Sequence, residues 1–95
     1  MFIVLLKFAA NRSKAPEFME GHKAWLQRGF DDGVFLLAGS LQPNQGGGIL
    51  AQGASRGDLE RRVKEDPFVV QNVVDAEVLE LTASRTDPRL AFLQT

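Results

Sequence analysis

The histidine at position 22 is the only one in the chain, and imidazole is the side chain best suited to exchange protons near neutral pH. Its position on a helix follows from spacing. Apolar or small residues recur around it at steps of three and four, which places them on one helical face: Phe18, Trp25, Leu26 and Gly29. His22 therefore lies within an apolar stripe, where an unpartnered polar group costs about 1–3 kcal/mol. We expect another polar side chain to meet it.

Asp66 is the candidate for that partner. Leu59, Val63 and Asp66 fall at i, i+4 and i+7, so the carboxylate belongs to the inward face of a second helix. Pro67 follows, and the residue before a proline is driven out of the helical conformation. Asp66 is thus expected at a chain break with its side chain pointing inward. A carboxylate that binds one ring nitrogen would leave the other nitrogen free for general acid–base catalysis.

Composition argues against several classes of function. The 95 residues, 44% of them hydrophobic, predict one small globular domain spanning residues 1–95. The net charge of −1 comes from 11 basic and 12 acidic residues spread along the chain. Because no basic patch is evident, we expect no nucleic-acid partner. With one histidine and no cysteine, we expect no metal site and no cofactor. No apolar run approaches the ~18 residues of a membrane span, and residues 2–8 are typical of a strand, so we expect a cytoplasmic protein.

The order of predicted elements indicates a fold. Strands are predicted at residues 2–8, 34–38, 49–52 and 73–82, and the glycines at 46–48 indicate a turn between the second and third. One helix is expected from a Ser13 cap to about residue 32, with Gly33 ending it, and another from a capping box at residues 55–58. Strand–helix–strand–strand–helix–strand is the ferredoxin-like βαββαβ arrangement of the α+β class: a four-stranded antiparallel sheet with both helices on one face. That topology brings the His22 and Asp66 stripes into one layer.

The first strand is apolar on both faces, and the helices cover only one of them. An exposed apolar face of that size usually marks an interface, so we expect a homodimer that packs sheet on sheet. The core is expected at residues 1–82. Residues 83–95 form a tail with an apolar end, which we expect to dock on the domain or on the partner subunit.

The chain resembles the YCII-related (YciI-like) family of the dimeric α+β barrel superfamily over residues 1–82. The resemblance depends on the order and spacing of several motifs: MFIVLL at the start, the His22 helix ending GFDDG, Ala38-Gly39-Ser40, the glycines at 46–48, and Asp66-Pro67-Phe68. It implies a fold similar to that of muconolactone isomerase, and one branch is described as a dehydrochlorinase of a chlorinated hydroxyhydroquinone. The His–Asp active site of the family corresponds here to His22 and Asp66. Many members have proline at the position of Ser40.

Two functions remain open. In the first, the chain is an enzyme whose His22–Asp66 pair transfers protons in the elimination or isomerisation of a small, polar, cyclic ligand, with Ser40 donating a hydrogen bond to a substrate oxygen. Because no nucleophile is evident, proton transfer is favoured over acyl transfer. In the second, the chain is a non-catalytic dimeric module that binds a small ligand or another protein domain, and the His–Asp pair is structural.

Gly21 and Gly29, which lie within the first predicted helix, also have two interpretations, one structural and one functional. Each costs about 1 kcal/mol against alanine within a helix, so each should have a compensating role. Close packing against a neighbouring element is the favoured interpretation, and room for a ligand beside His22 is the alternative.

Overall fold

The computed structural model describes residues 1–94. Thr95, the last residue of the predicted tail, lies outside the described residues. The elements follow one another along the chain as β1 (Phe2–Phe8), η1 (Arg12–Lys14), α1 (Ala15–Asp31), β2 (Phe35–Leu41), β3 (Gly46–Ala51), α2 (Arg56–Lys64), α3 (Pro67–Val70), β4 (Val74–Glu80) and η2 (Pro88–Leu93).

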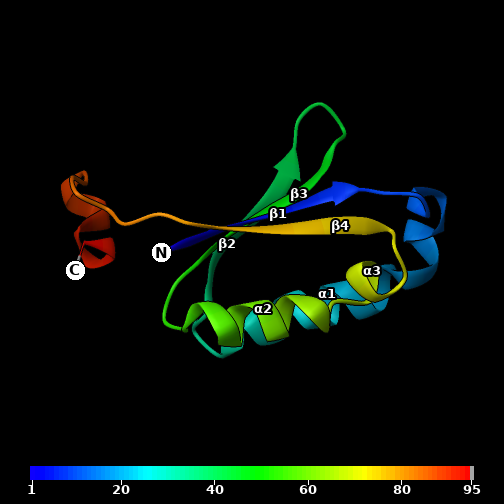
Figure 1. The fold of residues 1–95 in the computed structure, drawn as a ribbon, viewed down its shortest axis with the longest axis horizontal. Helices are drawn as coiled ribbons and strands as arrows, with labels where there is room; N and C mark the ends of the chain where they lie inside the picture. Colours follow the sequence, from blue (N-terminus) through cyan, green and yellow to red (C-terminus); the bar gives the residue numbers. More distant parts are fainter. Residues whose placement is uncertain (95) are drawn as a thin grey trace.

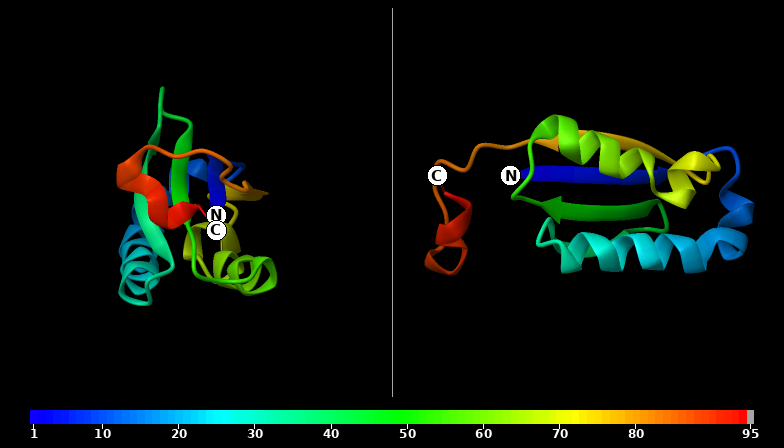
Figure 2. Two further views of the ribbon diagram at one scale, coloured as in Figure 1. Left: turned by 90° about the vertical axis from the view of Figure 1, so that its left-hand side faces the viewer. Right: turned by 90° about the horizontal axis from the view of Figure 1, so that it is seen from below.

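The strands form one antiparallel sheet in the order β2-β3-β1-β4. Helices α1, α2 and α3 all lie on the same side of it (Figure 1), and Figure 2 shows α1 beneath the β2 side and α2 beneath the β4 side. This is the predicted ferredoxin-like α+β fold, which is confirmed. Within residues 1–94, no helix has the length and apolar content needed to cross a membrane.

Helix α1 ends as predicted but begins differently. Gly33 follows its C-terminus with φ +73°, a left-handed conformation that favours glycine. The predicted Ser13 cap is wrong: Ser13 lies within the 3₁₀ turn η1, and Lys14 occupies the cap position without a side-chain hydrogen bond. Pro16 in the first turn needs no N–H partner there, and the 3₁₀ turn continues directly into the helix.

The hairpin between β2 and β3 is shorter than predicted, because the glycines at 46–48 belong to β3 rather than to the turn. They pair with Leu5, Leu6 and Lys7 of β1. Gly46 has φ +127°, and a Cβ there would lie 2.0 Å from the Leu6 carbonyl oxygen, so only glycine fits at this position. The glycines therefore allow β3 to run close beside β1 at the end of the sheet.

The core fills the space between the helices and the sheet. Alternate residues of β1 point into it, and Trp25 of α1 is buried at its centre. Phe18, a member of the predicted apolar stripe, packs against this core, whereas Phe30 is exposed. Gly29 faces Phe35, whose ring occupies the space that a side chain at position 29 would need. Gly29 therefore allows α1 to pack closely against Phe35, which is the interpretation favoured from the sequence.

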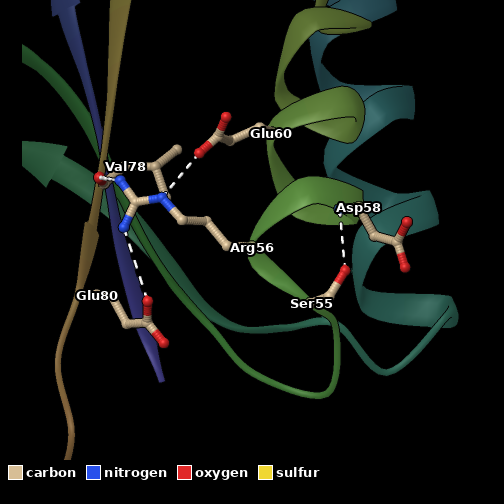
Figure 3. A network of polar contacts seen from close by, with 6 residues as sticks. All are labelled: Ser55, Arg56, Asp58, Glu60, Val78 and Glu80. Carbon is tan, nitrogen blue, oxygen red and sulfur yellow. Dashed lines mark hydrogen bonds and ion pairs between the residues drawn. The ribbon is translucent and has the colours of Figure 1, made fainter.

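Helix α2 is fixed at its N-terminus and along one side. Ser55 accepts a hydrogen bond from the Asp58 amide at 3.1 Å, as the capping-box pattern predicts. Arg56 reaches from α2 to the edge strand β4, where it donates to the Val78 carbonyl oxygen at 2.9 Å, while also pairing with Glu60 (Figure 3). These contacts fasten α2 along the β4 edge of the sheet.

The opposite side of the sheet, here called the open face, is covered by no helix among residues 1–94. The strand register aligns one apolar residue from each strand into a row across it: Leu37, Leu50, Ile3 and Leu79. Leu37 is 60% exposed and Leu79 40%. The apolar second face expected from the first strand thus crosses all four strands along this row, whereas the charged pair Lys7 and Asp75 and the residue Glu77 lie on the same face farther along β1 and β4.

The tail after β4 leaves the end of the sheet and turns back on itself in η2 (Figure 1). Gln94 closes this turn by donating to the Ser84 carbonyl oxygen at 2.9 Å. Leu93 is buried, whereas Leu90 and Phe92 are exposed. The tail therefore presents two large apolar side chains at one end of the molecule.

Candidate active site

The structure brings His22 and Asp66 together. His22 lies on the second turn of α1, and Asp66 is the residue before α3, where its extended conformation follows from the proline after it. The His22 Nδ1 atom is 2.8 Å from the Asp66 Oδ1 atom. Two residues separated by 44 positions thus meet in the layer between helices and sheet, where the helical spacing of each predicted they would.

The Asp66 side chain has two tasks at once. It is completely buried, and its Oδ1 atom also accepts a hydrogen bond from the Phe68 amide at 3.0 Å, which caps α3. Because an amide can only donate, Oδ1 acts as an acceptor, and the matching role for His22 Nδ1 is that of donor. The second carboxylate oxygen of Asp66, Oδ2, has no hydrogen-bond partner among residues 1–94. This arrangement assigns the proton of a neutral imidazole to Nδ1 and leaves Nε2 as a base.

Two aromatic rings hold the imidazole. The Phe68 ring stacks on it with a centroid distance of 4.1 Å and an interplanar angle of 4°, and the Trp25 ring lies 5.8 Å away at 27°. Trp25 is itself fixed by a hydrogen bond from Nε1 to the Arg62 carbonyl oxygen at 2.9 Å. The ring orientation of His22 is therefore set by packing as well as by Asp66.

His22 opens onto a pocket of about 340 Å³ between α1 and the β1, β2 and β3 strands. The side chain of His22 keeps 14% of its surface exposed, and with Nδ1 occupied, Nε2 is the nitrogen available to a ligand. The pocket walls are mainly apolar, and the residues that line it are Leu6, Phe8, Met19, His22, Lys23, Leu26, Ala38, Gly39, Ser40, Gly46, Gly47, Gly48, Ile49, Phe68 and Val74. An acid–base group in a mostly apolar cleft is a suitable arrangement for small-molecule chemistry.

Ser40 belongs to the same pocket. Its partner across the sheet is Gly47, which in turn pairs with the buried Leu6, so the Ser40 side chain lies on the helix-covered face. No hydrogen bond links Ser40 to His22 among the described residues. Ser40 is thus placed to meet a ligand in the pocket, and a Ser-His-Asp triad does not form.

Gly21 explains how α3 comes so close to α1. A Cβ at position 21 would lie 3.1 Å from the Pro67 Cγ atom, which is tighter than ordinary contact. Pro67 immediately follows Asp66, so the small residue on α1 allows the carboxylate to reach His22. The alternative, in which Gly21 leaves room for a ligand, is wrong because Pro67 fills that space.

Sequence reasoning missed Lys23. Its position next to His22 puts it on the polar side of α1, yet its side chain lines the pocket. The apolar stripe marks only the centre of the buried face, and a long lysine stem can run along the edge of a cleft while its ammonium group stays in water. Lys23 and the glycines of β3 are the parts of the pocket that spacing on a helix did not reveal.

Within residues 1–94, no three histidine, cysteine, aspartate or glutamate side chains gather in a way that would hold a metal ion.

No family model matches the chain, and no curated protein matches it. Membership of the YCII-related family thus stays a prediction. Among solved structures, the chain is similar to 5-chloro-2-hydroxyhydroquinone dehydrochlorinase (TftG) from Burkholderia phenoliruptrix AC1100, in a complex with 2,5-dihydroxybenzoquinone. The TM-score is 0.70 at 12% identity, over 88% of this chain and 96% of that chain. At this identity the likeness shows a shared fold.

Proposed function

We propose that the chain is an enzyme of the YCII-related type that catalyses elimination or isomerisation of a small, polar, cyclic substrate without a cofactor. The observation that carries this proposal is the orientation of His22: Asp66 holds Nδ1, and the ring opens onto an apolar pocket. A dehydrochlorinase among proteins of the same fold supports the reaction class.

In the proposed elimination, the carbon that bears the leaving group is tetrahedral, as in the keto tautomer of a hydroxylated ring, and His22 Nε2 removes a proton from a carbon or hydroxyl conjugated with it. The electron pair of the broken C–H or O–H bond forms a new double bond, any intervening double bond shifts, and the leaving group departs with its bonding electrons. The imidazolium then returns its proton to the solvent. In an isomerisation, it returns the proton to a different carbon of the same substrate. Asp66 keeps the imidazole oriented and stabilises its charged form, and Ser40 donates a hydrogen bond to a substrate oxygen.

The test is turnover by purified protein of 5-chloro-2-hydroxyhydroquinone and of small lactones, followed by chloride release and by chromatography. His22→Asn should lower the rate by about 100-fold or more, the usual size of a lost acid–base group. The asparagine amide can still donate to Asp66, so the fold should be kept. Lys64→Ala, on an exposed position of α2 outside the pocket, is the control and should stay within about twofold of the wild type by the general tolerance of surface sites.

Undiminished turnover by His22→Asn would contradict the catalytic role. Binding of these compounds without turnover by the wild type would favour the second function, a non-catalytic ligand-binding module. That function has its own support, because Asp66 also caps α3 and so has a structural reason to be present.

We also propose that two copies pack through the open face to form a dimeric α+β barrel. The row of apolar side chains across all four strands supports this assembly, since a monomer rarely exposes such a continuous apolar area. The tail at residues 83–95 would dock on the partner subunit. Its exposed Leu90 and Phe92 support that placement.

A further inference from the structure

The charges around the pocket are of one sign. Of the fifteen residues that line it, only His22 and Lys23 are ionisable, and neither aspartate nor glutamate is among them. A ligand in this pocket therefore meets an imidazole and a hydroxyl against apolar walls, with Lys23 at the edge of the cleft. Such walls exclude water and strengthen the attraction between a ligand charge and a protein charge.

The nearest carboxylate is screened from the pocket. Asp66 lies behind the His22 ring, has no exposed surface, and directs its Oδ1 atom to the imidazole and to the Phe68 amide. The negative charge of Asp66 therefore acts mainly on the imidazole of His22 and not on a ligand in the pocket. A ligand that bears a negative charge would approach the Nε2 side of His22 without facing an exposed carboxylate.

Lys23 is available for a ligand. None of the ion pairs among residues 1–94 involves it, although Glu20 lies one turn earlier on α1. Another cation at this end of the molecule, Arg12, packs over the Phe8 ring at 4.3 Å and donates to the Asn44 carbonyl oxygen. Arg12 therefore adds positive charge behind one wall of the pocket, and Lys23 is the cation that borders it directly.

We infer that the pocket binds an anionic ring compound, one that carries an enolate, phenolate or carboxylate oxygen, and that Lys23 determines this specificity by pairing with the charge. The inference extends the proposed function by naming its substrate class and depends on the same pocket. The ring lies against the apolar walls, the charged oxygen is directed to Lys23, and the reacting atom is left for His22. Lys23 acts as a binding residue, so its loss should raise KM more than it lowers kcat.

The test is the affinity of four probes by calorimetry. Two are anionic, 2,5-dihydroxybenzoquinone as its enolate and benzoate, and each has a neutral counterpart, 2,5-dimethoxybenzoquinone and benzamide. The wild type should bind at least one anion more tightly than its counterpart, and added salt should weaken that binding. Which anion binds distinguishes an enolate ligand from a carboxylate ligand.

Lys23→Gln keeps a polar side chain that is one atom shorter and removes its charge, so it should raise the Kd of the anion by about five- to tenfold. The same change at Lys64, outside the pocket, is the matched control and should leave the Kd unchanged. The inference is overturned if Lys23→Gln binds the anion as tightly as the wild type does. It is also overturned if the neutral probes bind equally well, or if none of the four binds.

The same measurements on His22→Asn separate this inference from the proposed function. Anion binding that depends on Lys23 and survives in His22→Asn supports the inference even if no turnover is found. Turnover that depends on His22 but is insensitive to Lys23 supports the enzyme and contradicts the inference. Melting temperatures of all variants check that Lys23, an exposed residue, is changed without loss of the fold.

Discussion

Neighbouring residues of β1 have the same apolar character but differ in burial according to the face they occupy. Val4 and Leu6 point toward the helices and are buried, whereas Ile3 and Leu5 point to the open face and are only partly covered. The chain supplies its own cover for one face and none for the other. The helix-covered face holds the candidate chemistry, and the open face holds the candidate interface. This difference teaches that apolar patterning of a strand alone does not report its burial within the single subunit.

The largest effect on folding is expected on the helix-covered face at Trp25. Trp25→Ala should lower the free energy of unfolding by about 3–5 kcal/mol, because it leaves a large cavity in the core and removes the hydrogen bond to the Arg62 carbonyl oxygen. Urea titration followed by circular dichroism measures this loss. A loss below about 1 kcal/mol, the size expected for an exposed site, would contradict the burial of the indole.

The second largest loss in the free energy of unfolding is expected at Asp66. Asp66→Ala removes the cap of α3 and leaves the half-buried His22 without its partner, which together should cost about 2–4 kcal/mol. Asp66→Asn keeps an oxygen that can accept from the Phe68 amide, so it should be the milder change by about 1 kcal/mol. Urea titration of both variants tests this order. Equal losses would show that capping contributes nothing.

The two glycines of α1 should respond differently to alanine substitution, because their neighbours lie at different distances. A Cβ at Gly29 would lie 2.1 Å from a Phe35 ring carbon, so Gly29→Ala should cost about 1–3 kcal/mol despite the better helix propensity of alanine. At Gly21 the nearest atom, Pro67 Cγ, is 3.1 Å away, so Gly21→Ala should change stability by less than about 1 kcal/mol. Thermal melts of the two variants give the comparison. Equal losses would contradict the closer packing at Gly29.

The smallest effect on the fold is expected on the open face. Leu37→Lys alters a side chain that is 60% exposed, so the far-UV circular dichroism spectrum should be unchanged. Its effect should be on assembly, because a lysine at the β2 end of the apolar row would place one charge from each copy in a sheet-to-sheet interface. Sedimentation velocity at micromolar concentration should show a dimer for the wild type and a monomer for the variant. A monomeric wild type would remove the basis for the interface.

The fold and the His22–Asp66 contact could both be predicted from the sequence, for a common reason. The apolar stripe of each helix sets which residues face the sheet, and Pro67 sets where the second helix stops, so local rules determine both side-chain directions. The strand order then followed from topology.

Other features depend on contacts beyond the immediate sequence neighbours and could not be predicted from local patterns alone. Gly46 looks like a turn residue until β1 is placed beside it, and only then does the Leu6 carbonyl oxygen explain the glycine. Ser13 has the right side chain for a cap, but the 3₁₀ turn before α1 moves the cap to Lys14. Lys23 lines the pocket because of where β2 and β3 lie, which no helical spacing reveals.

One oxygen atom, Oδ1 of Asp66, both starts α3 and holds the imidazole. Selection for a well-folded chain alone would thus preserve this aspartate, whether or not the chain is a catalyst. The His22 side chain makes no hydrogen bond to the backbone among residues 1–94. Across diverging relatives, the proposed activity therefore predicts that the histidine is retained together with the aspartate, whereas selection for the fold alone predicts that the aspartate is retained more often than the histidine.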